Sequence, residues 1–163
     1  MWPPNTSSVG RAALGHSSEQ QVKSRFAPGF CGGSRHNSAM NTPAPRLIKL
    51  TAQPTGIPDT DHPKPDRLVR GNPLRETWNR VDAALPAGQV FCGVWRCEPG
   101  RWRIAMGETE QELFTVLLGR CRVHDALGGF EELGPGEGLY IPPGFAGEFE
   151  VLEPLTKTYM IAE

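Results

Sequence analysis

Apolar and polar residues alternate through the C-terminal half of the chain in short stretches that end at turn residues. Residues 101–106 read Arg, Trp, Arg, Ile, Ala, Met, which is the two-residue period of a strand with one buried face. Residues 112–118 are nearly all apolar, as in a strand buried on both faces. The same pattern predicts further strands over residues 89–97, 120–126, 130–133, 138–141, 145–152 and 157–162.

Turn residues separate these stretches at intervals of roughly ten residues. Gly128 and Gly129 form the tip of a predicted hairpin, because glycine accepts the positive φ angles of a tight turn. Seven or eight short strands without a helical period predict an all-β sandwich or barrel.

The N-terminal part of the chain has a different composition. Residues 1–45 are rich in Ser, Gly, Pro and Asn, and they contain four basic residues against the single acid Glu19. Such a segment cannot bury enough apolar surface to offset its ordering entropy, so we expect a disordered tail. Two other interpretations stay open: translation starts at Met40, or this Ser-rich segment is an organelle transit peptide.

Residues 46–89 are predicted to form an arm that packs on a barrel made of residues 90–163. Residues 47–50 favour a short strand at the start of this arm. Residues 66–78 offer a few apolar anchors interrupted by a glycine and a proline, so we expect them to cover the barrel without forming a long helix.

Composition and charge narrow the possible functions. The 163 residues are enough for one domain with a proper core, and 19 glycines with 16 prolines suit short strands and many turns. A net charge of −1 provides no electrostatic basis for binding nucleic acid. No apolar stretch approaches the roughly eighteen residues of a membrane-spanning helix. We expect a cytoplasmic protein with no nucleic-acid and no membrane partner.

The four cysteines, Cys31, Cys92, Cys97 and Cys121, form no CxxC pair and therefore do not indicate a zinc site. We expect reduced, mostly structural thiols, with a disulfide between Cys92 and Cys97 as the open alternative.

The C-terminal half contains two sequence motifs, here called frames, in which glycines, prolines and glutamates are set at particular spacings. In the first, Gly100 and Gly119 enclose Met106, Glu108 and Glu112. The second frame consists of Gly136, Pro142, Pro143, Gly144 and Gly147.

These frames resemble the two motifs of the cupin family, and in detail those of small cupins related to (S)-ureidoglycine aminohydrolase and to the ethanolamine-utilisation cupins. The resemblance extends from residue 93 to residue 161. It implies an RmlC-like jelly roll, which is a double-stranded β-helix, with a pocket at the mouth of the barrel. Because such proteins are often dimeric, it also implies a homodimer that binds a small-molecule ligand.

The resemblance implies histidines at positions 106, 108 and 147 and a glutamate at 112, where a metal would bind. This sequence has Met106, Glu108, Glu112 and Gly147 at those positions, so one of four expected ligands is present. Glycine has no donor atom, and a thioether is a poor ligand for hard ions. We therefore expect no histidine-based metal site and no cofactor, with a weak divalent cation at Glu108 and Glu112 as the alternative. His124 is expected to be a solvated strand residue.

Glu108 and Glu112 would share one apolar pocket if both face the barrel interior. Desolvation and mutual repulsion would then raise the pKa of at least one of them, leaving a neutral acid beside an ionised base. Alternatively, Arg101 or Arg103 neutralises one of the two carboxylates, and the resulting ion pair has only a structural role. Tyr140, in the strand before the proline turn, is the third candidate catalytic residue. Residues expected to line the pocket, if they do not serve only as core, are Met106, Trp95, Trp102, Arg103, Gly147 and Phe149.

Three functions follow from these observations. The first is a small cupin that binds a small polar or carboxylate-bearing metabolite in its barrel. The second is an enzyme resembling ureidoglycine aminohydrolase or a sugar isomerase, with Glu112 as base and Glu108 or Tyr140 as acid. The third is a ligand-free dimerisation or regulatory module whose barrel is filled by large residues. The fold alone does not distinguish these three functions.

Overall fold

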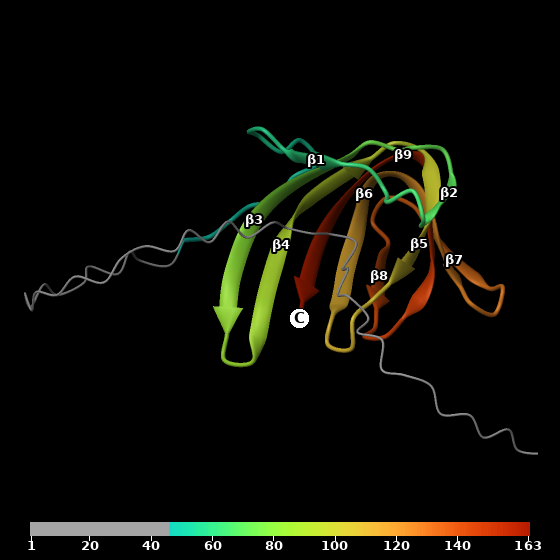
Figure 1. Cartoon of the computed structure of the whole chain (residues 1–163). Helices are drawn as coiled ribbons and strands as arrows, with labels where there is room; N and C mark the ends of the chain where they lie inside the picture. Colours follow the sequence, from blue (N-terminus) through green and yellow to red (C-terminus); the bar gives the residue numbers. More distant parts are fainter. Residues whose placement is uncertain (1–45) are drawn as a thin grey trace, which may run out of the picture.

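We describe residues 46–163 from a computed structural model of the chain; these residues form nine β-strands and no helix (Figure 1). No segment of the described part is therefore a helix able to cross a membrane. The predictions for the tail, the start at Met40 and Cys31 lie outside the described residues. The strands are β1 (Asp59–Asp61), β2 (Leu68–Arg70), β3 (Arg75–Leu85), β4 (Gly88–Cys97), β5 (Gly100–Ala105), β6 (Gln111–Asp125), β7 (Phe130–Leu133), β8 (Gly138–Ile141) and β9 (Ala146–Ala162).

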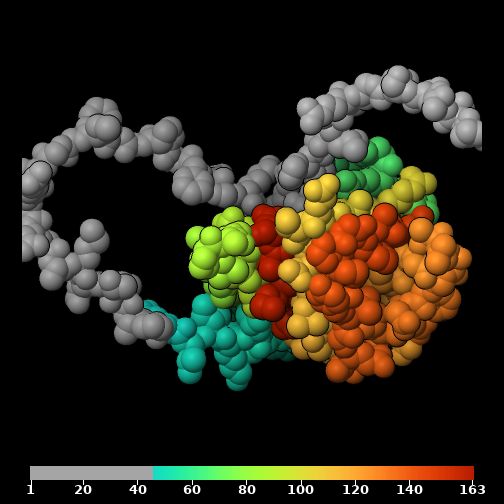
Figure 2. Space-filling model, turned by 90° about the horizontal axis from the view of Figure 1, so that it is seen from below, coloured from blue at the N-terminus to red at the C-terminus, as the bar shows by residue number. Residues whose placement is uncertain are grey.

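Two long strands, β6 and β9, connect the two halves of one curled antiparallel sheet. Residues 111–118 of β6 pair with residues 156–162 of β9, and residues 120–125 pair with residues 147–153. The first half also contains β1, β3, β4 and β8, and the second half contains β2, β5 and β7. Figure 2, seen from below, shows the end of β9 between the β3–β4 hairpin and β6. This is the all-β jelly-roll arrangement that the strand pattern predicts.

Both long strands pass from one half of the sheet to the other at a bulge. Gly119 has a φ angle of 81°, and a Cβ at this position would lie 2.2 Å from the carbonyl oxygen of Pro154. The turn-like sequence around Gly119 predicts two separate strands, but β6 continues through it with shifts in register. Likewise, the sequence predicts separate strands at 145–152 and 157–162, but the structure has the single strand β9 over this region. A glycine bulge bends a strand without ending its hydrogen bonding, and a local pattern does not distinguish these outcomes.

The core lies between the two halves of the sheet and is rich in aromatic rings. The rings of Trp102 and Phe149 stack with centroids 5.4 Å apart, and Trp95 meets Phe149 edge-on at 5.8 Å. Phe114 completes this cluster at 5.9 Å from Phe149. These contacts join β4, β5, β6 and β9, so they hold both halves together around the barrel interior.

The N-terminal arm covers the outer face of the first half of the sheet. The indole of Trp78 donates a hydrogen bond to the carbonyl oxygen of Gly56 at 2.9 Å, and the Arg80 guanidinium donates one to Thr55. Residues 46–50 belong to no strand, so the short strand predicted at 47–50 is wrong. Residues 66–78 form no helix, as predicted; they contribute β2 and the start of β3, which pairs along its length with β4.

Cys92, Cys97 and Cys121 are free thiols, so the alternative of a Cys92–Cys97 disulfide is not realised. Burial raises the pKa of Cys97 to about 12 and that of Cys121 to about 11. Both therefore behave as buried apolar residues.

Candidate functional site

The inner faces of β6 and β9 present two charged residues to the barrel interior. Strand alternation places Glu112 on the same face as the core residue Phe114, and Lys157 on the same face as Tyr159. The register of the two strands sets Glu112 opposite Ile161, and Lys157 opposite Val116. Both charged side chains thus enter the core from neighbouring strands.

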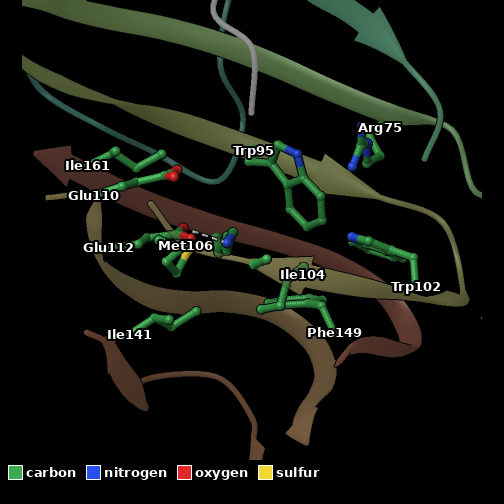
Figure 3. A pocket seen from close by; sticks show the side chains of 12 residues that line it. Arg75, Trp95, Trp102, Ile104, Met106, Glu110, Glu112, Ile141, Phe149 and Ile161 are labelled. Atoms are coloured by element: carbon green, nitrogen blue, oxygen red, sulfur yellow. Dashed lines mark hydrogen bonds and ion pairs between the residues drawn. The ribbon is translucent and has the colours of Figure 1, made fainter. Parts of the chain in front are cut away.

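These residues line a cavity of about 40 Å³ inside the barrel (Figure 3). Such a space accommodates a water molecule or the polar head of a small organic compound. Two buried carboxylates lie at one end, and Arg75 with Trp102 lies at the other. The lining residues are Arg75, Trp95, Trp102, Ile104, Ala105, Met106, Glu110, Glu112, Ile141, Phe149, Lys157 and Ile161.

The central feature of the cavity wall is an ion pair between Lys157 and Glu112. The Lys157 ammonium donates a hydrogen bond to Oε1 of Glu112 at 2.7 Å, marked by the dashed line in Figure 3. The side chains expose only 2% and 8% of their surface. Nζ also lies 4.3 Å from the ring centre of Phe114 and 4.9 Å from those of Trp95 and Phe149. One carboxylate and three aromatic faces together compensate a buried positive charge.

A second buried carboxylate, Glu110, lies in the loop that leads into β6. Its Oε2 accepts a hydrogen bond from the backbone N–H of Gly107 at 3.0 Å. Burial raises the pKa of Glu110, the bond from Gly107 opposes this rise, and the negative charges of Glu163 and Glu112 add to it. The cavity therefore has a carboxyl group that holds a proton more readily than usual, close to an ion-paired carboxylate.

The opposite end of the cavity carries nitrogen donors. Arg75, at 4% exposure, donates to Oδ1 and Oδ2 of Asp61 at 2.9 and 2.6 Å, and its guanidinium carbon lies 5.7 Å from the ring centre of Trp102. Trp102 is 2% exposed, and the nitrogen end of its indole points toward Trp95 and Ile104 (Figure 3). No acceptor within residues 46–163 hydrogen-bonds this Nε1. An indole N–H directed into a cavity is a donor for a ligand.

Five residues predicted for the pocket line this cavity: Trp95, Trp102, Met106, Glu112 and Phe149. Their catalytic or binding roles stay predictions, but the structure brings them together as expected.

Four other predicted residues lie elsewhere. Glu108 is exposed in a bend, so the expected pairing with Glu112 is wrong and Glu110 is the second carboxylate of the cavity. Tyr140 is 52% exposed, and its hydroxyl donates to Gln111 at 2.8 Å on the outer face of the sheet. Arg103 is exposed, and Gly147 does not line the cavity. In each case strand alternation or the loop before β6 turns the residue away from the interior.

The alternative in which Arg101 or Arg103 neutralises one of the two carboxylates is not realised at Glu112, which pairs with Lys157. Arg101 instead bonds Oε2 of Glu148 at 2.5 Å. His124, expected to be solvated, is half-buried and lies 2.8 Å from Oε2 of Glu150. Arg70 bonds the other oxygen of Glu150 at 2.8 Å. These groups form an ionic network on the outer face of the second half of the sheet, away from the cavity.

Sequence reasoning missed Lys157, Glu110 and Arg75. Alternation in the predicted strand 157–162 puts Lys157 on the same face as Tyr159 and Ile161, and that signal was sufficient to find it. Glu110 and Arg75 had no such signal, because a loop and a distant strand position them.

A transition metal does not fit the residues at the expected ligand positions. Met106 offers only a thioether, Gly147 offers no donor, and Glu108 is exposed. The remaining ligand, Glu112, already accepts a hydrogen bond from an ammonium group. Within residues 46–163 no group of three His, Cys, Asp or Glu side chains is placed to hold a metal ion.

Residues 84–159 match the family model of the EutQ-like cupin domain. This match identifies residues 84–159 as a EutQ-like cupin domain. Among solved structures, a DUF861-family protein of unknown function from Pseudomonas syringae aligns with a TM-score of 0.58 at 18% identity, covering 69% of this chain and 46% of that one. At that identity the likeness shows the cupin fold.

Two EutQ structures are also similar. The EutQ protein of Clostridium difficile has a TM-score of 0.48 and 17% identity, covering 55% of this chain and 63% of that chain. A putative ethanolamine utilization protein Q from Salmonella typhimurium has a TM-score of 0.44 and 15% identity, covering 67% and 97%. The present chain thus covers less than two thirds of the length of the Pseudomonas and Clostridium proteins. No curated protein matches the chain.

Proposed function

We propose that this cupin binds a small polar organic molecule in the cavity beside Lys157 and Glu112. The observation that carries the proposal is a buried ion pair whose two members both line the cavity. Burying two charges costs several kcal/mol before their attraction is counted, and apolar residues would fill a purely structural core at lower cost. Charges retained at a cavity wall are therefore best explained by a ligand that contacts them.

The hydrogen-bonding groups around the cavity describe the ligand. Lys157 makes one hydrogen bond to the described part of the chain and has two further N–H groups, and Trp102 adds a third donor. Glu110 and Glu112 supply acceptors at the end where Lys157 lies, and the Trp102 donor is at the opposite end of the cavity. A compact molecule with both an acceptor and a donor satisfies both ends, while the rings of Trp95 and Phe149 contact its apolar part.

A thermal-shift screen of small acids, amides, amines and polyols tests this function. We expect at least one compound to raise the melting temperature of the wild type, and Glu112→Gln to lose this response, because the variant removes the carboxylate but keeps an oxygen for Lys157. Glu108→Gln is the matched control, since it makes the same change at an exposed site. A screen without any stabilising compound, or an equal response in Glu112→Gln, would contradict the proposed site.

The second candidate function is acid–base catalysis in the same cavity, favoured by Glu110. A carboxyl group whose pKa is raised by burial, in the same cavity as an ion-paired carboxylate, is the arrangement that general acid–base chemistry uses. Glu110 then takes the acid role that the sequence analysis assigned to Glu108 or Tyr140, and Glu112 remains the base. Turnover of a compound found in the screen, lost in Glu110→Gln but with binding retained, would separate an enzyme from a binding protein.

A further inference from the structure

The position of Lys157 affects whether a metal ion could bind in this barrel. Its Nζ lies 2.7 Å from Glu112, the one residue of a metal-binding set that the sequence retains. The same nitrogen is surrounded by the faces of three aromatic rings. A positive charge thus already occupies the centre of the barrel, covalently attached to β9.

The field of this charge reaches other groups in the core. Burial is the main cause of the raised pKa of Cys121, but the positive charge of Lys157 acts against that rise. The same is true of Cys97, where Arg75 and Lys157 both oppose it. A divalent ion placed beside Glu112 would be repelled by an ammonium group within a few ångströms in a weakly screened interior.

We propose that Lys157 is the built-in cation of this cupin: it excludes divalent metals from the cavity and binds a carbonyl or carboxyl oxygen of the ligand in their place. The ligand class rests on the function proposed above. Two further N–H groups of Lys157 supply donors for that oxygen, the Trp102 indole supplies a donor at the opposite end of the cavity, and Glu110 accepts from or donates to the rest of the ligand.

Manganese binding tests the exclusion of metal, because Mn²⁺ accepts carboxylate ligands and is detected by electron paramagnetic resonance. We expect Lys157→Met to bind Mn²⁺ at least about tenfold more tightly than the wild type, since the repulsive charge is gone. The double variant Lys157→Met/Glu112→Gln should lose this gain, and Lys49→Met, which removes an exposed lysine, should show none. Lys157→Gln provides the same test with a smaller cost in stability.

Two results would overturn the exclusion of metal. One is wild-type protein, purified without chelator, that keeps about one equivalent of a transition metal through dialysis. The other is the absence of any gain in Mn²⁺ affinity in both Lys157 variants.

A series of three-carbon probes tests the ligand class. Propionate, propionamide, 1-propanol and propylamine have nearly the same size but differ in the group offered to Lys157. We expect propionamide or propionate to raise the melting temperature of the wild type and to have no effect on Lys157→Gln. Stabilisation by propylamine alone, stabilisation that survives in Lys157→Gln, or no response to any probe would refute the role of Lys157. The proposed function is tested separately by the wider screen: it is refuted if that screen finds no ligand or if Glu112→Gln responds as the wild type does.

Discussion

The ammonium nitrogen of Lys157 lies 2.7 Å from Oε1 of Glu112, and neither side chain exposes more than 8% of its surface. Removing one partner leaves the other charge buried and unpaired, whereas removing both eliminates the two charges together. We therefore expect Glu112→Leu alone to lower the free energy of unfolding by about 3–5 kcal/mol, and Glu112→Leu/Lys157→Met to lie within about 1 kcal/mol of the wild type. Urea denaturation of the double-mutant cycle measures both, and additive effects of the two single variants would contradict this coupling.

Glu110 should make the cupin less stable as the pH rises. Because its pKa is raised in the folded state, the folded protein holds this proton to higher pH than the unfolded chain, whose carboxyl titrates near 4.5. The contribution of Glu110 to stability is therefore complete below pH 4.5, the ordinary pKa of this carboxyl, and is lost as the pH rises through its higher folded pKa. Glu110→Gln should remove this decline and be more stable than the wild type at neutral pH. Unfolding free energies measured across this range test it, with the exposed Glu108→Gln as the control that should follow the wild type.

The outer ionic network should respond to pH in the opposite sense. Burial alone would raise the pKa of Glu150, but the hydrogen bond with His124 and the charges of Arg101 and Arg70 together lower it. Its contribution to stability is then complete above the ordinary value of 4.5 and is lost as the pH falls through the lower folded value. Glu150→Gln should flatten the stability profile in acid. Denaturant unfolding across this pH range measures the effect, with the exposed Glu131→Gln as the control, and a Glu150→Gln profile as steep as that of the wild type or the control would refute it.

Gly147 cannot be converted into the histidine that a metal site would need. A Cβ at this position would lie 2.1 Å from the carbonyl oxygen of His124 and 2.8 Å from the ring of Phe145. Because the first contact is with backbone, β9 and β6 would have to separate. We expect Gly147→Ala to cost about 3 kcal/mol and Gly147→His at least as much. Gly107→Ala, whose Cβ would make an ordinary contact at 3.4 Å, is the control for chemical denaturation.

Thiol reactivity should follow burial. Cys97 and Cys121, with pKa values raised by burial to about 12 and about 11, have almost no thiolate at pH 8, whereas Cys92 is only half-buried. In a Cys31→Ser background we expect iodoacetamide to label Cys92 first, and the other two only after denaturation. Peptide mass spectrometry gives the order, and fast labelling of Cys97 in the folded protein would show that the core opens.

Several features of the candidate site were predictable because they depend on local pattern. Alternation of apolar and polar residues locates most of the strands and places Trp102 on an inward face, whereas the inward position of Glu112 is implied by the resemblance to the cupin motifs. The prediction failed for Glu108, which belongs to a bend where alternation no longer holds. It failed for Tyr140 because β8 turns this residue to the outer face, and the spacing of a turn does not reveal which face a short edge strand buries.

The sequence by itself determined the strand pattern and the turns, since these follow from two-residue periodicity and from the backbone preferences of glycine and proline, and its resemblance to the cupin motifs indicated the carboxylate at position 112. Only the tertiary structure decided that Lys157 neutralises Glu112 and that Glu110 and Arg75 complete the cavity. The reason is that β3, the loop before β6 and the end of β9 lie far apart along the chain and meet only when the sheet curls. Charge pairing inside the barrel is set by that closure, and no local pattern encodes it.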